Sequence, residues 1–238
     1  MLADIHARRD PCSQRPIGDL IEITAADGHR LSVYCVPPKG RSRGGLIVNQ
    51  ELFGVNAHIK SVAERFAAEG YFALAPAYYD RVERGFAVGY GLAELELARA
   101  ALPKLNLDKM LLDGAAALRF AAAAGKVGMV GYCSGGSTAW AAAGQLEGLA
   151  CAISYYGGRI PAMSHLKPRV PVMLHWGETD HTISMEAVQE VTTEHPEVVS
   201  HVYAAGHGFN CDLRTAYEPV SAETAYARSV EFLRSHVG

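Results

Sequence analysis

The residues best suited to covalent chemistry lie in the stretch 131–136, which reads Gly-Tyr-Cys-Ser-Gly-Gly. It follows an apolar segment at 126–130 that is typical of a buried strand, and an alanine-rich helix start comes after it. This setting predicts a nucleophile elbow, with Cys133 where serine usually stands. Its glycines leave room where a Cβ would clash, and the helix N-terminus would stabilise a thiolate. The alternative is a buried structural cysteine beside a glycine-rich turn.

A cysteine nucleophile needs a base, and the base needs a group that fixes its orientation. Asp180 follows a predicted strand at 170–175, and His207 lies between two glycines after a predicted strand at 198–203. We expect His207 to be the base and Asp180 the orienting carboxylate, because the order nucleophile, acid, histidine is that of α/β-hydrolases. Taken alone, Asp180 could instead cap a helix that begins near Ser184, and His207 could be an ordinary loop histidine.

A fourth element follows the predicted strand that ends at Asn49. The stretch 50–56 reads Gln-Glu-Leu-Phe-Gly-Val-Asn, at the position from which such folds supply the second amide of the oxyanion hole. The backbone N–H groups of Leu52 and Ser134 are therefore the candidates that stabilise a tetrahedral oxyanion. Glu51 would then lie close to the sulfur, although it could also be a solvated loop acid or a helix cap.

Segments of strand length alternate with helical patterns along most of the chain. This predicts a mostly parallel twisted sheet with helices on both faces and functional residues at the carboxyl ends of strands. Two alternating segments around Asp27 and Gly28 predict an N-terminal antiparallel hairpin. The stretch from Tyr78 to Lys104 is too long for a plain connection, and we interpret it as a surface excursion that borders the site. The other expected strands are 45–49, 71–75, 126–130, 150–155, 170–175 and 198–203, and the expected helices are 57–68, 108–124, 135–145, 185–191 and 216–236.

The composition is that of a globular protein, with 49% hydrophobic and 20% charged residues among 238 and a formal net charge of −3. There is no basic excess for nucleic acid, and no stretch approaches the roughly 18 apolar residues of a membrane span. The five cysteines are scattered without a Cys-x-x-Cys pair, so we expect neither disulfides nor a metal site. We predict one domain over residues 1–238, with a core over about 18–235. We also expect a cytoplasmic location, no cofactor, and a monomer or weak homo-oligomer.

Together the motifs resemble those of the dienelactone hydrolase (carboxymethylenebutenolidase) family of α/β-hydrolases. The stretches that carry the resemblance are 50–56, 131–136, 177–180 and 206–209. The resemblance covers roughly residues 18 to 235 and implies that Cys133 is the nucleophile, His207 its base and Asp180 the orienting acid. It also implies that Glu51 holds the resting thiol and is displaced when substrate binds. Such control would protect the thiol from oxidation between turnovers.

The arginines are where the sequence departs from the family. The best-known members bind the carboxylate of dienelactone with one arginine shortly after the catalytic histidine and another in the excursion before the long helix. Cys211 stands where the first is expected, and Arg214 could replace it only if the loop turns back. A guanidinium would suit a carboxylate, but the arginines of the excursion fit no pattern that aligns, and each could be an ordinary surface residue. The candidates for contact with substrate are Arg81, Arg84, Arg99, Arg214, Tyr132, Phe53 and Phe209.

These observations predict a hydrolase that cleaves a small ester or lactone, preferably a dienelactone-like enol lactone, through a thioester on Cys133. One alternative is a general carboxylesterase of the same fold, acting on another substrate or with Ser134 or Ser137 as nucleophile. Ser134 lies one residue beyond the tip of the elbow, and Ser137 lies inside the helix. The other alternative is a non-catalytic, redox-sensing or binding member of the fold, since a fold does not fix a function.

Overall fold

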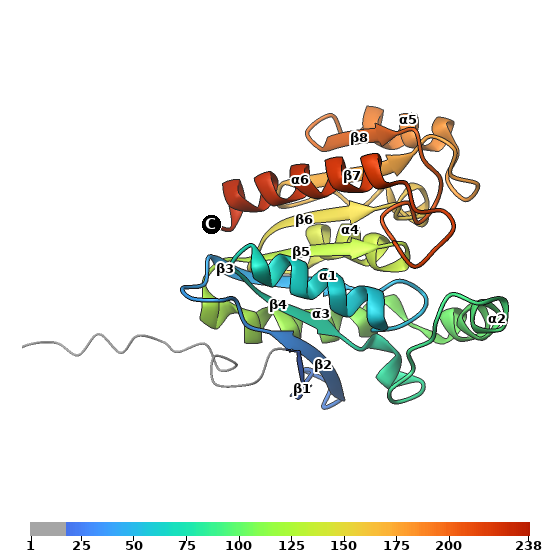
Figure 1. The fold of residues 1–238 in the computed structure, drawn as a ribbon. Coiled ribbons are helices and arrows are strands. Elements are labelled where there is room, and N and C mark those ends of the chain that lie inside the picture. Colours follow the sequence, from blue (N-terminus) through green and yellow to red (C-terminus); the bar gives the residue numbers. More distant parts are fainter. Residues whose placement is uncertain (1–17) are drawn as a thin grey trace, which may run out of the picture.

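The computed structural model describes residues 18–238, and its centre is one eight-stranded sheet (Figure 1). The strands lie in the order β1-β2-β4-β3-β5-β6-β7-β8. The pairs β1/β2 and β2/β4 are antiparallel, and all other neighbours are parallel. This confirms the predicted, mostly parallel sheet with an N-terminal hairpin. The strands are β1 (Asp19–Thr24), β2 (Arg30–Val36), β3 (Gly44–Asn49), β4 (Tyr71–Pro76), β5 (Val127–Tyr132), β6 (Leu149–Tyr155), β7 (Val172–Gly177) and β8 (Val199–Tyr203).

The burial of each strand explains its sequence pattern. Every residue of β3, β4, β5 and β7 is buried, so these strands are continuous apolar runs covered on both faces. In β1 only one face packs on the core, because Ile21 and Ile23 are buried while Glu22 and Thr24, which alternate with them, are exposed. Three of the strands that carry the predicted site, β3, β5 and β7, are therefore fully buried, whereas β8, which precedes His207, is an edge strand of the sheet.

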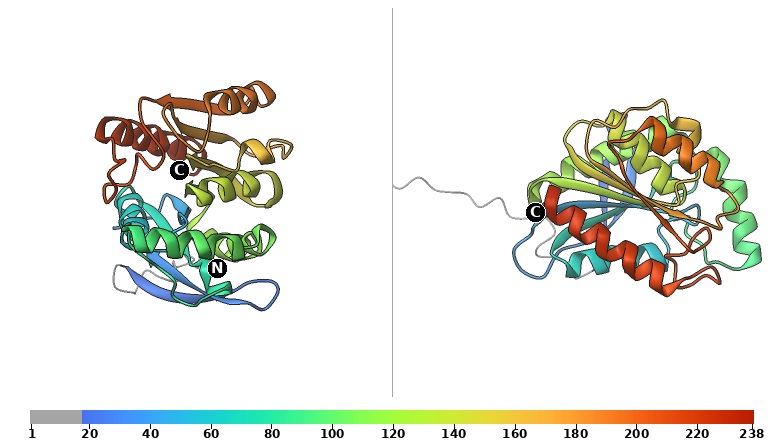
Figure 2. Two further views of the ribbon diagram at one scale, coloured as in Figure 1. Left: turned by 90° about the vertical axis from the view of Figure 1, so that its right-hand side faces the viewer. Right: turned by 90° about the horizontal axis from the view of Figure 1, so that it is seen from above.

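The helices cover both faces of the sheet (Figures 1 and 2). On one face α1 (Ala57–Ala68) and α6 (Pro219–His236) lie side by side, and the hydroxyl of Tyr226 donates to the carbonyl of Arg65 at 3.2 Å. On the other face are α3 (Leu107–Ala121) and α4 (Ser134–Gln145). The remaining helices are α2 (Leu92–Ala101), α5 (Met185–Glu194) and the short 3-10 helices η1 (Tyr78–Arg81), η2 (Leu102–Lys104), η3 (Ala122–Ala124) and η4 (Pro161–Met163). None of the helices within residues 18–238 is long and apolar enough to cross a membrane.

The excursion between β4 and α3 contains a helix that the sequence pattern did not predict. Only Ala98 and Ala101 of α2 are buried, while Leu92 and Leu97 are exposed, so the helix has no strong apolar stripe. It projects beyond the carboxyl ends of the parallel strands (Figure 1). The excursion therefore lies at the end of the sheet where the site was expected.

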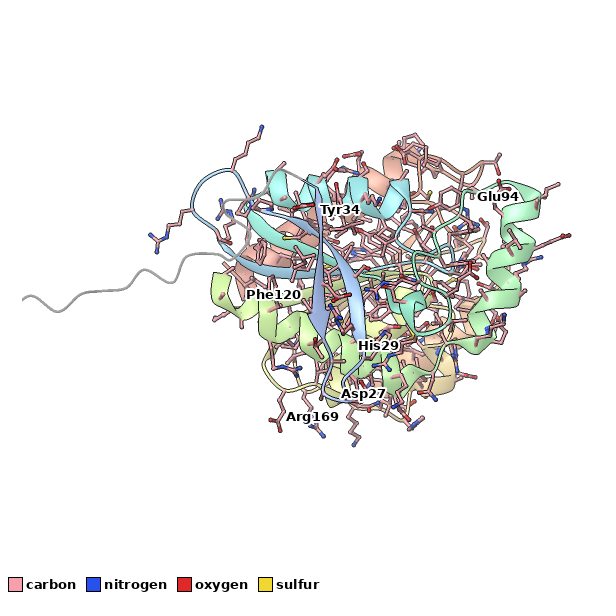
Figure 3. All side chains as sticks on the ribbon, turned by 90° about the horizontal axis from the view of Figure 1, so that it is seen from below. Asp27, His29, Tyr34, Glu94, Phe120 and Arg169 are labelled. Carbon is pink, nitrogen blue, oxygen red and sulfur yellow. The ribbon has the colours of Figure 1, made fainter. Side chains whose placement is uncertain are left out.

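The N-terminal hairpin is fixed to the rest of the fold by ion pairs at its turn. Asp27 accepts hydrogen bonds from Arg81 of η1 and Lys109 of α3, at 3.0 Å each (Figure 3 labels the hairpin turn). These hydrogen bonds hold the pKa of the Asp27 carboxyl well below its usual range, the one from Arg81 having the largest effect. The same Arg81 guanidinium donates to Asp113 of α3, so a single arginine joins hairpin, excursion and helix.

The cysteines differ sharply in their surroundings. Cys35 is disulfide-bonded, so the expectation that the chain lacks disulfides is wrong, because spacing in the sequence does not report which sulfurs meet in space. Cys133, Cys151 and Cys211 are free. Burial raises the pKa of both the Cys151 and the Cys211 thiols to about 12. Of these three, only Cys133 is partly exposed.

Candidate active site

Cys133 lies at the tip of the turn that joins β5 to α4. Its φ of 54° and ψ of −116° belong to a region that residues other than glycine rarely adopt. Its N–H donates to the carbonyl of Tyr155 at 3.0 Å. A Cβ on Gly131 would clash with the carbonyl of Gly135, and a Cβ on Gly135 would clash with the carbonyl of Gln50. The turn therefore requires glycine at both positions, as predicted, and the packing around it maintains the strained backbone.

The predicted acid and base meet after the last two strands. Asp180 follows β7 and His207 follows β8, and the Nδ1 of His207 lies 2.7 Å from the Oδ2 of Asp180. The Asp180 carboxylate is fully buried, and the His207 ring is nearly so. Cys133 lies near His207, close enough for its thiol to contribute to the raised pKa of the ring. The structure thus brings together Cys133, His207 and Asp180.

Burial and hydrogen bonding act in opposite directions on this pair. Burial lowers the pKa of His207, but the hydrogen bonds with Asp180 and Cys133 outweigh it and raise the pKa to about 10. Burial alone would raise the pKa of Asp180, yet the hydrogen bond from His207 leaves it below its ordinary value. The Asp180 carboxylate therefore stabilises a positive charge on the ring, which is the charge that a general base gains when it takes a proton.

Thr182 is a part of this site that the sequence analysis missed. Its N–H and its hydroxyl both donate to the Oδ1 of Asp180 at 2.7 Å, and its Oγ1 lies 3.0 Å from the Nδ1 of His207. A threonine two residues after an aspartate is a recognisable turn motif, and this was the available signal. The contact with the histidine, 25 residues later in the chain, has no sequence signature.

The two amides proposed for the oxyanion hole lie on neighbouring strands. β3 pairs with β5, and Asn49 lies opposite Gly131, so the turn that contains Leu52 is beside the elbow. Among residues 18–238, neither the Leu52 N–H nor the Ser134 N–H donates to another protein group. The Leu52 carbonyl accepts a hydrogen bond from the Tyr79 hydroxyl at 2.8 Å, which fixes that turn. Both amides are available to an oxygen of a ligand.

Glu51 is neither a solvated loop acid nor a helix cap. Its carboxylate is fully buried, and the cap of α1 is Asn56, whose side chain accepts from the N–H of Ile59. The Oε2 of Glu51 accepts a hydrogen bond from Tyr90 at 2.8 Å. Its Oε1 lies 3.6 Å from the Nη1 of Arg214 and has no hydrogen bond within the described part of the chain. No hydrogen bond joins Glu51 to Cys133 in these same residues, so one carboxylate oxygen remains available.

The loop after His207 does turn back, and it brings Arg214 to Glu51. The N–H of Cys211 donates to the carbonyl of Gly208 at 3.0 Å, and the N–H of Arg214 donates to the carbonyl of Cys211 at 3.1 Å. Gly208 has a φ of +83°, and a Cβ there would clash with the Arg214 guanidinium. The sequence alone left this path open, because it depends on how the loop folds.

The other candidates for substrate contact have different neighbours. Arg81 is engaged by Asp27 and Asp113, and Arg84 forms an ion pair with Glu22. Arg99 lies on the exposed part of α2. The aromatic candidates are all buried. Tyr132 stacks on Tyr155, Phe209 packs against Tyr155, Tyr156 and Tyr203, and Phe53 packs against Tyr90 with the Arg214 guanidinium 5.8 Å from its ring centre.

One group of side chains has the donor types that bind zinc. Single atoms of Glu51, His58 and Cys211 lie within 4.8 Å of one another, and all three residues are buried. However, Arg214 already places a positive charge beside Glu51, and burial raises the pKa of the Cys211 thiol, which would have to lose its proton to bind a metal. Glu51 therefore suits the Arg214 guanidinium that already lies beside it better than a metal ion.

Known proteins of one family are similar to this chain over most of its length. The model of the dienelactone hydrolase family matches residues 31–237. A carboxymethylenebutenolidase from a Pseudomonas species is 34% identical over 229 residues, which cover 90% of this chain and 94% of the relative. Another from Pseudomonas putida is 30% identical over 226 residues, with 90% and 94% covered.

Solved structures show the same fold. A dienelactone hydrolase-like promiscuous phosphotriesterase from metagenomic libraries matches with a TM-score of 0.74 at 22% identity, covering 94% of this chain and all of the other. A Pyrococcus furiosus esterase matches with a TM-score of 0.67 at 20% identity, covering 93% and 92%. This chain therefore belongs to the dienelactone hydrolase family, within the α/β-hydrolase superfamily, and is a dienelactone hydrolase-like hydrolase.

Proposed function

We propose that the protein cleaves a small ester or lactone with Cys133 as nucleophile, His207 as general base and Asp180 as the carboxylate that orients the base. The observation that carries the proposal is the position of His207. Its Nδ1 lies 2.7 Å from the Oδ2 of Asp180, and the ring lies near Cys133, which contributes to its raised pKa. Nucleophile, base and orienting group in contact are the arrangement that covalent acyl transfer needs.

The proposed reaction has two halves. In the first, His207 takes the proton of Cys133, the sulfur attacks the acyl carbon, and the N–H groups of Leu52 and Ser134 stabilise the oxyanion. The C–O bond then breaks, the leaving oxygen takes the proton from His207, and a thioester remains. In the second half His207 takes a proton from water, the hydroxide attacks the thioester, and the sulfur leaves and regains its proton. Asp180 stabilises the imidazolium in both halves.

The preferred substrate class is an ester or lactone with a good leaving group, such as an enol. A thiolate is readily expelled from the tetrahedral intermediate when the competing leaving group is poor, so amides should react slowly. The relatives named carboxymethylenebutenolidases support a lactone of this kind. The Arg214 guanidinium, turned toward the site, is the candidate among the predicted arginines for an anionic group of such a substrate.

Glu51 is proposed to guard the thiol between turnovers. Its buried carboxylate has one oxygen bound by Tyr90 and one without a hydrogen-bond donor among the described residues. The free oxygen would accept a hydrogen bond from the protonated thiol in the resting enzyme, and Arg214 would hold the carboxylate once substrate displaces it. Thiol ionisation would then depend on substrate, which limits oxidation of Cys133.

The serine alternative is less well supported by the contacts. Ser137 is buried, and its Oγ accepts a hydrogen bond from the N–H of Arg159 at 3.0 Å. Ser137 lies within α4, and its hydroxyl oxygen already accepts this hydrogen bond. Ser134 lies beyond the strained residue of the elbow, and its N–H is the group needed for the oxyanion.

The deciding experiment compares Cys133→Ala with Cys151→Ala, which removes a buried thiol of β6 instead. Cys133→Ala should lower the turnover of 4-nitrophenyl butyrate by about a thousandfold or more, while Cys151→Ala keeps it. Circular dichroism would check that both variants fold. Turnover retained by Cys133→Ala would remove Cys133 from the mechanism and favour a serine. A stoichiometric burst of nitrophenol without turnover in the wild type would instead indicate a sensor.

A further inference from the structure

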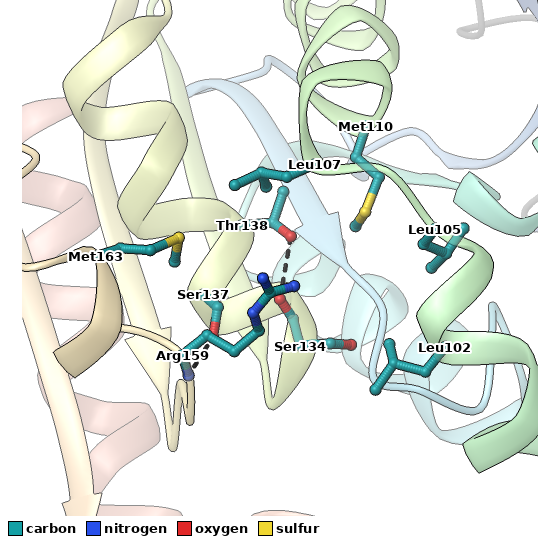
Figure 4. A pocket seen from close by; sticks show the side chains of 9 residues that line it. All are labelled: Leu102, Leu105, Leu107, Met110, Ser134, Ser137, Thr138, Arg159 and Met163. Atoms are coloured by element: carbon teal, nitrogen blue, oxygen red, sulfur yellow. Dashed lines mark hydrogen bonds between the residues drawn. The ribbon is translucent and has the colours of Figure 1, made fainter.

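A pocket opens beside the first turn of α4, one residue from Cys133 (Figure 4). Ser134, Ser137 and Thr138 form one wall, because residues three and four apart share a face of a helix. The pocket is narrow and partly open to solvent. An acyl or alcohol group of an ester bound at Cys133 would have this space directly beside it.

The facing wall is apolar and comes from three separate elements. The excursion and the start of α3 contribute three leucines and a methionine, and η4 contributes a second methionine. They are Leu102, Leu105, Leu107, Met110 and Met163. Methionine and leucine side chains adapt to apolar ligands of different shape. Such a wall suits a hydrocarbon arm rather than a compact polar ring.

Arg159 is the one charged residue that lines this pocket. The backbone N–H of Arg159 donates to the Oγ of Ser137, and a Cβ on Gly157 would lie only 3.0 Å from the backbone nitrogen of Ser137, so the loop after β6 packs closely against α4. Figure 4 shows the Arg159 guanidinium extended past Ser134 and Thr138, inside the ring of lining residues. Its backbone is fixed while its side chain faces the pocket.

Among the residues that the structure describes, no carboxylate pairs with the guanidinium of Arg159. By contrast, Arg214 faces Glu51, and Arg81 faces Asp27 and Asp113. A guanidinium beside an apolar wall attracts a carboxylate more strongly than one in open solvent, because less water competes for it. A single guanidinium balances one negative charge, which favours a carboxylate over a dianion.

We propose that Arg159 is a specificity-determining residue and binds a carboxylate at the end of an apolar arm of the substrate. The substrate class would be esters whose hydrocarbon arm lies along the leucine and methionine wall and ends in a carboxylate. This anion site is separate from the buried Glu51 and Arg214 pair. The inference rests on the proposed function, because Cys133 supplies the chemistry.

The test uses pairs of 4-nitrophenyl esters in which a carboxylate replaces the terminal methyl group. The pairs are succinate with butyrate, glutarate with valerate, and adipate with hexanoate. For each pair the quantity measured is kcat/KM for the anionic ester divided by kcat/KM for the neutral one. Because only the end of the arm differs, this ratio reports recognition of the carboxylate and not the rate of the chemical steps.

Arg159→Met should lower this ratio about tenfold for at least one arm length, mainly through KM, since a charged hydrogen bond is lost. Arg159→Lys keeps the charge without the planar fork and should retain part of the ratio. The matched control is Arg119→Met, which removes an exposed arginine from the last turn of α3 and should leave the ratio unchanged. High salt should reduce the ratio of the wild type but not that of Arg159→Met.

A ratio within about twofold of wild type for Arg159→Met at all three lengths would overturn the assignment. An equal loss on both esters of each pair would also overturn it, because it would indicate a structural role. Failure of the proposed function looks different. If Cys133→Ala still turns over 4-nitrophenyl butyrate, the proposed function is wrong. If Cys133→Ala is inactive and Arg159→Met leaves the ratio unchanged, only the anion site is rejected.

Discussion

The surroundings of Cys133 differ in how their charges are balanced. On one side the charged groups are buried and paired: Asp180 with His207, where Thr182 also donates to Asp180, and Glu51, which follows β3, with Arg214. On the side of α4 and the excursion, the pocket has an apolar wall and one unpaired guanidinium. Fixed, balanced charges lower the cost of reorganisation during a reaction. An unbalanced charge at a pocket instead discriminates between ligands.

The largest expected effect comes from breaking the paired side with Asp180→Asn. The amide cannot stabilise the imidazolium, so kcat/KM should fall by a factor of about 10² to 10⁴. The loss should be equal for anionic and neutral esters, because the pocket is untouched. If Asp180→Asn also changes the ratio of kcat/KM between anionic and neutral esters, the paired charges and the pocket are not independent.

The difference in stability between the wild type and Asp180→Asn should depend on pH. The folded-state pKa of His207 is about 10, above its ordinary value of 6.5, so its contribution to stability is complete below about pH 6.5 and is lost as the pH rises toward 10. The lowered pKa of Asp180 contributes only above its ordinary value near 3.8. The stability advantage of the wild type over Asp180→Asn should therefore be greatest between about pH 4 and 6.5. Urea unfolding at pH 5, 7 and 9 measures it, and a constant difference would contradict the pairing.

A smaller effect is expected from Thr182→Val, which keeps the shape of the side chain and removes its hydroxyl. Asp180 would lose one hydrogen bond, and the orientation of His207 would be less restricted, so kcat should fall about tenfold. Thr182→Ser keeps the hydroxyl and should recover most of the rate. A shift of the pH profile of kcat toward lower pH would separate a positioning role from a merely structural one. An unchanged rate and profile in the valine variant would exclude Thr182 from the site.

The smallest effect is expected from Gly208→Ala, which forces the Arg214 guanidinium away from Glu51. The positive φ and the clash together should cost about 1 to 2 kcal/mol of stability, with a decrease of a few-fold in turnover. Gly206→Ala is the matched control on the other side of His207, because its Cβ would have no atom closer than 3.8 Å. The esters of the pocket test sharpen the comparison. An anionic preference that falls with Gly208→Ala and not with Arg159→Met would place the carboxylate on the paired side.

Local sterics explain why much of the site could be predicted. The elbow depends on glycines next to Cys133 in the chain, and the acid and base follow strands whose apolar runs are evident. Arg214 depends on a loop path set by Gly208 and Cys211, which no pattern encodes. Helix α2 lacks an apolar stripe, and the disulfide of Cys35 depends on proximity in space. Arg159 follows the carboxyl end of β6, a position that could have been noted, but its pocket requires three distant elements.

The excursion between β4 and α3 contributes to both sides of Cys133. Tyr90 reaches Glu51, while Leu102 and Leu105 form part of the pocket wall. The strands that carry Cys133 and its partners do not depend on the length of this segment. In evolutionary terms, insertions and deletions there can alter substrate range and thiol protection together, while the reaction itself is inherited unchanged.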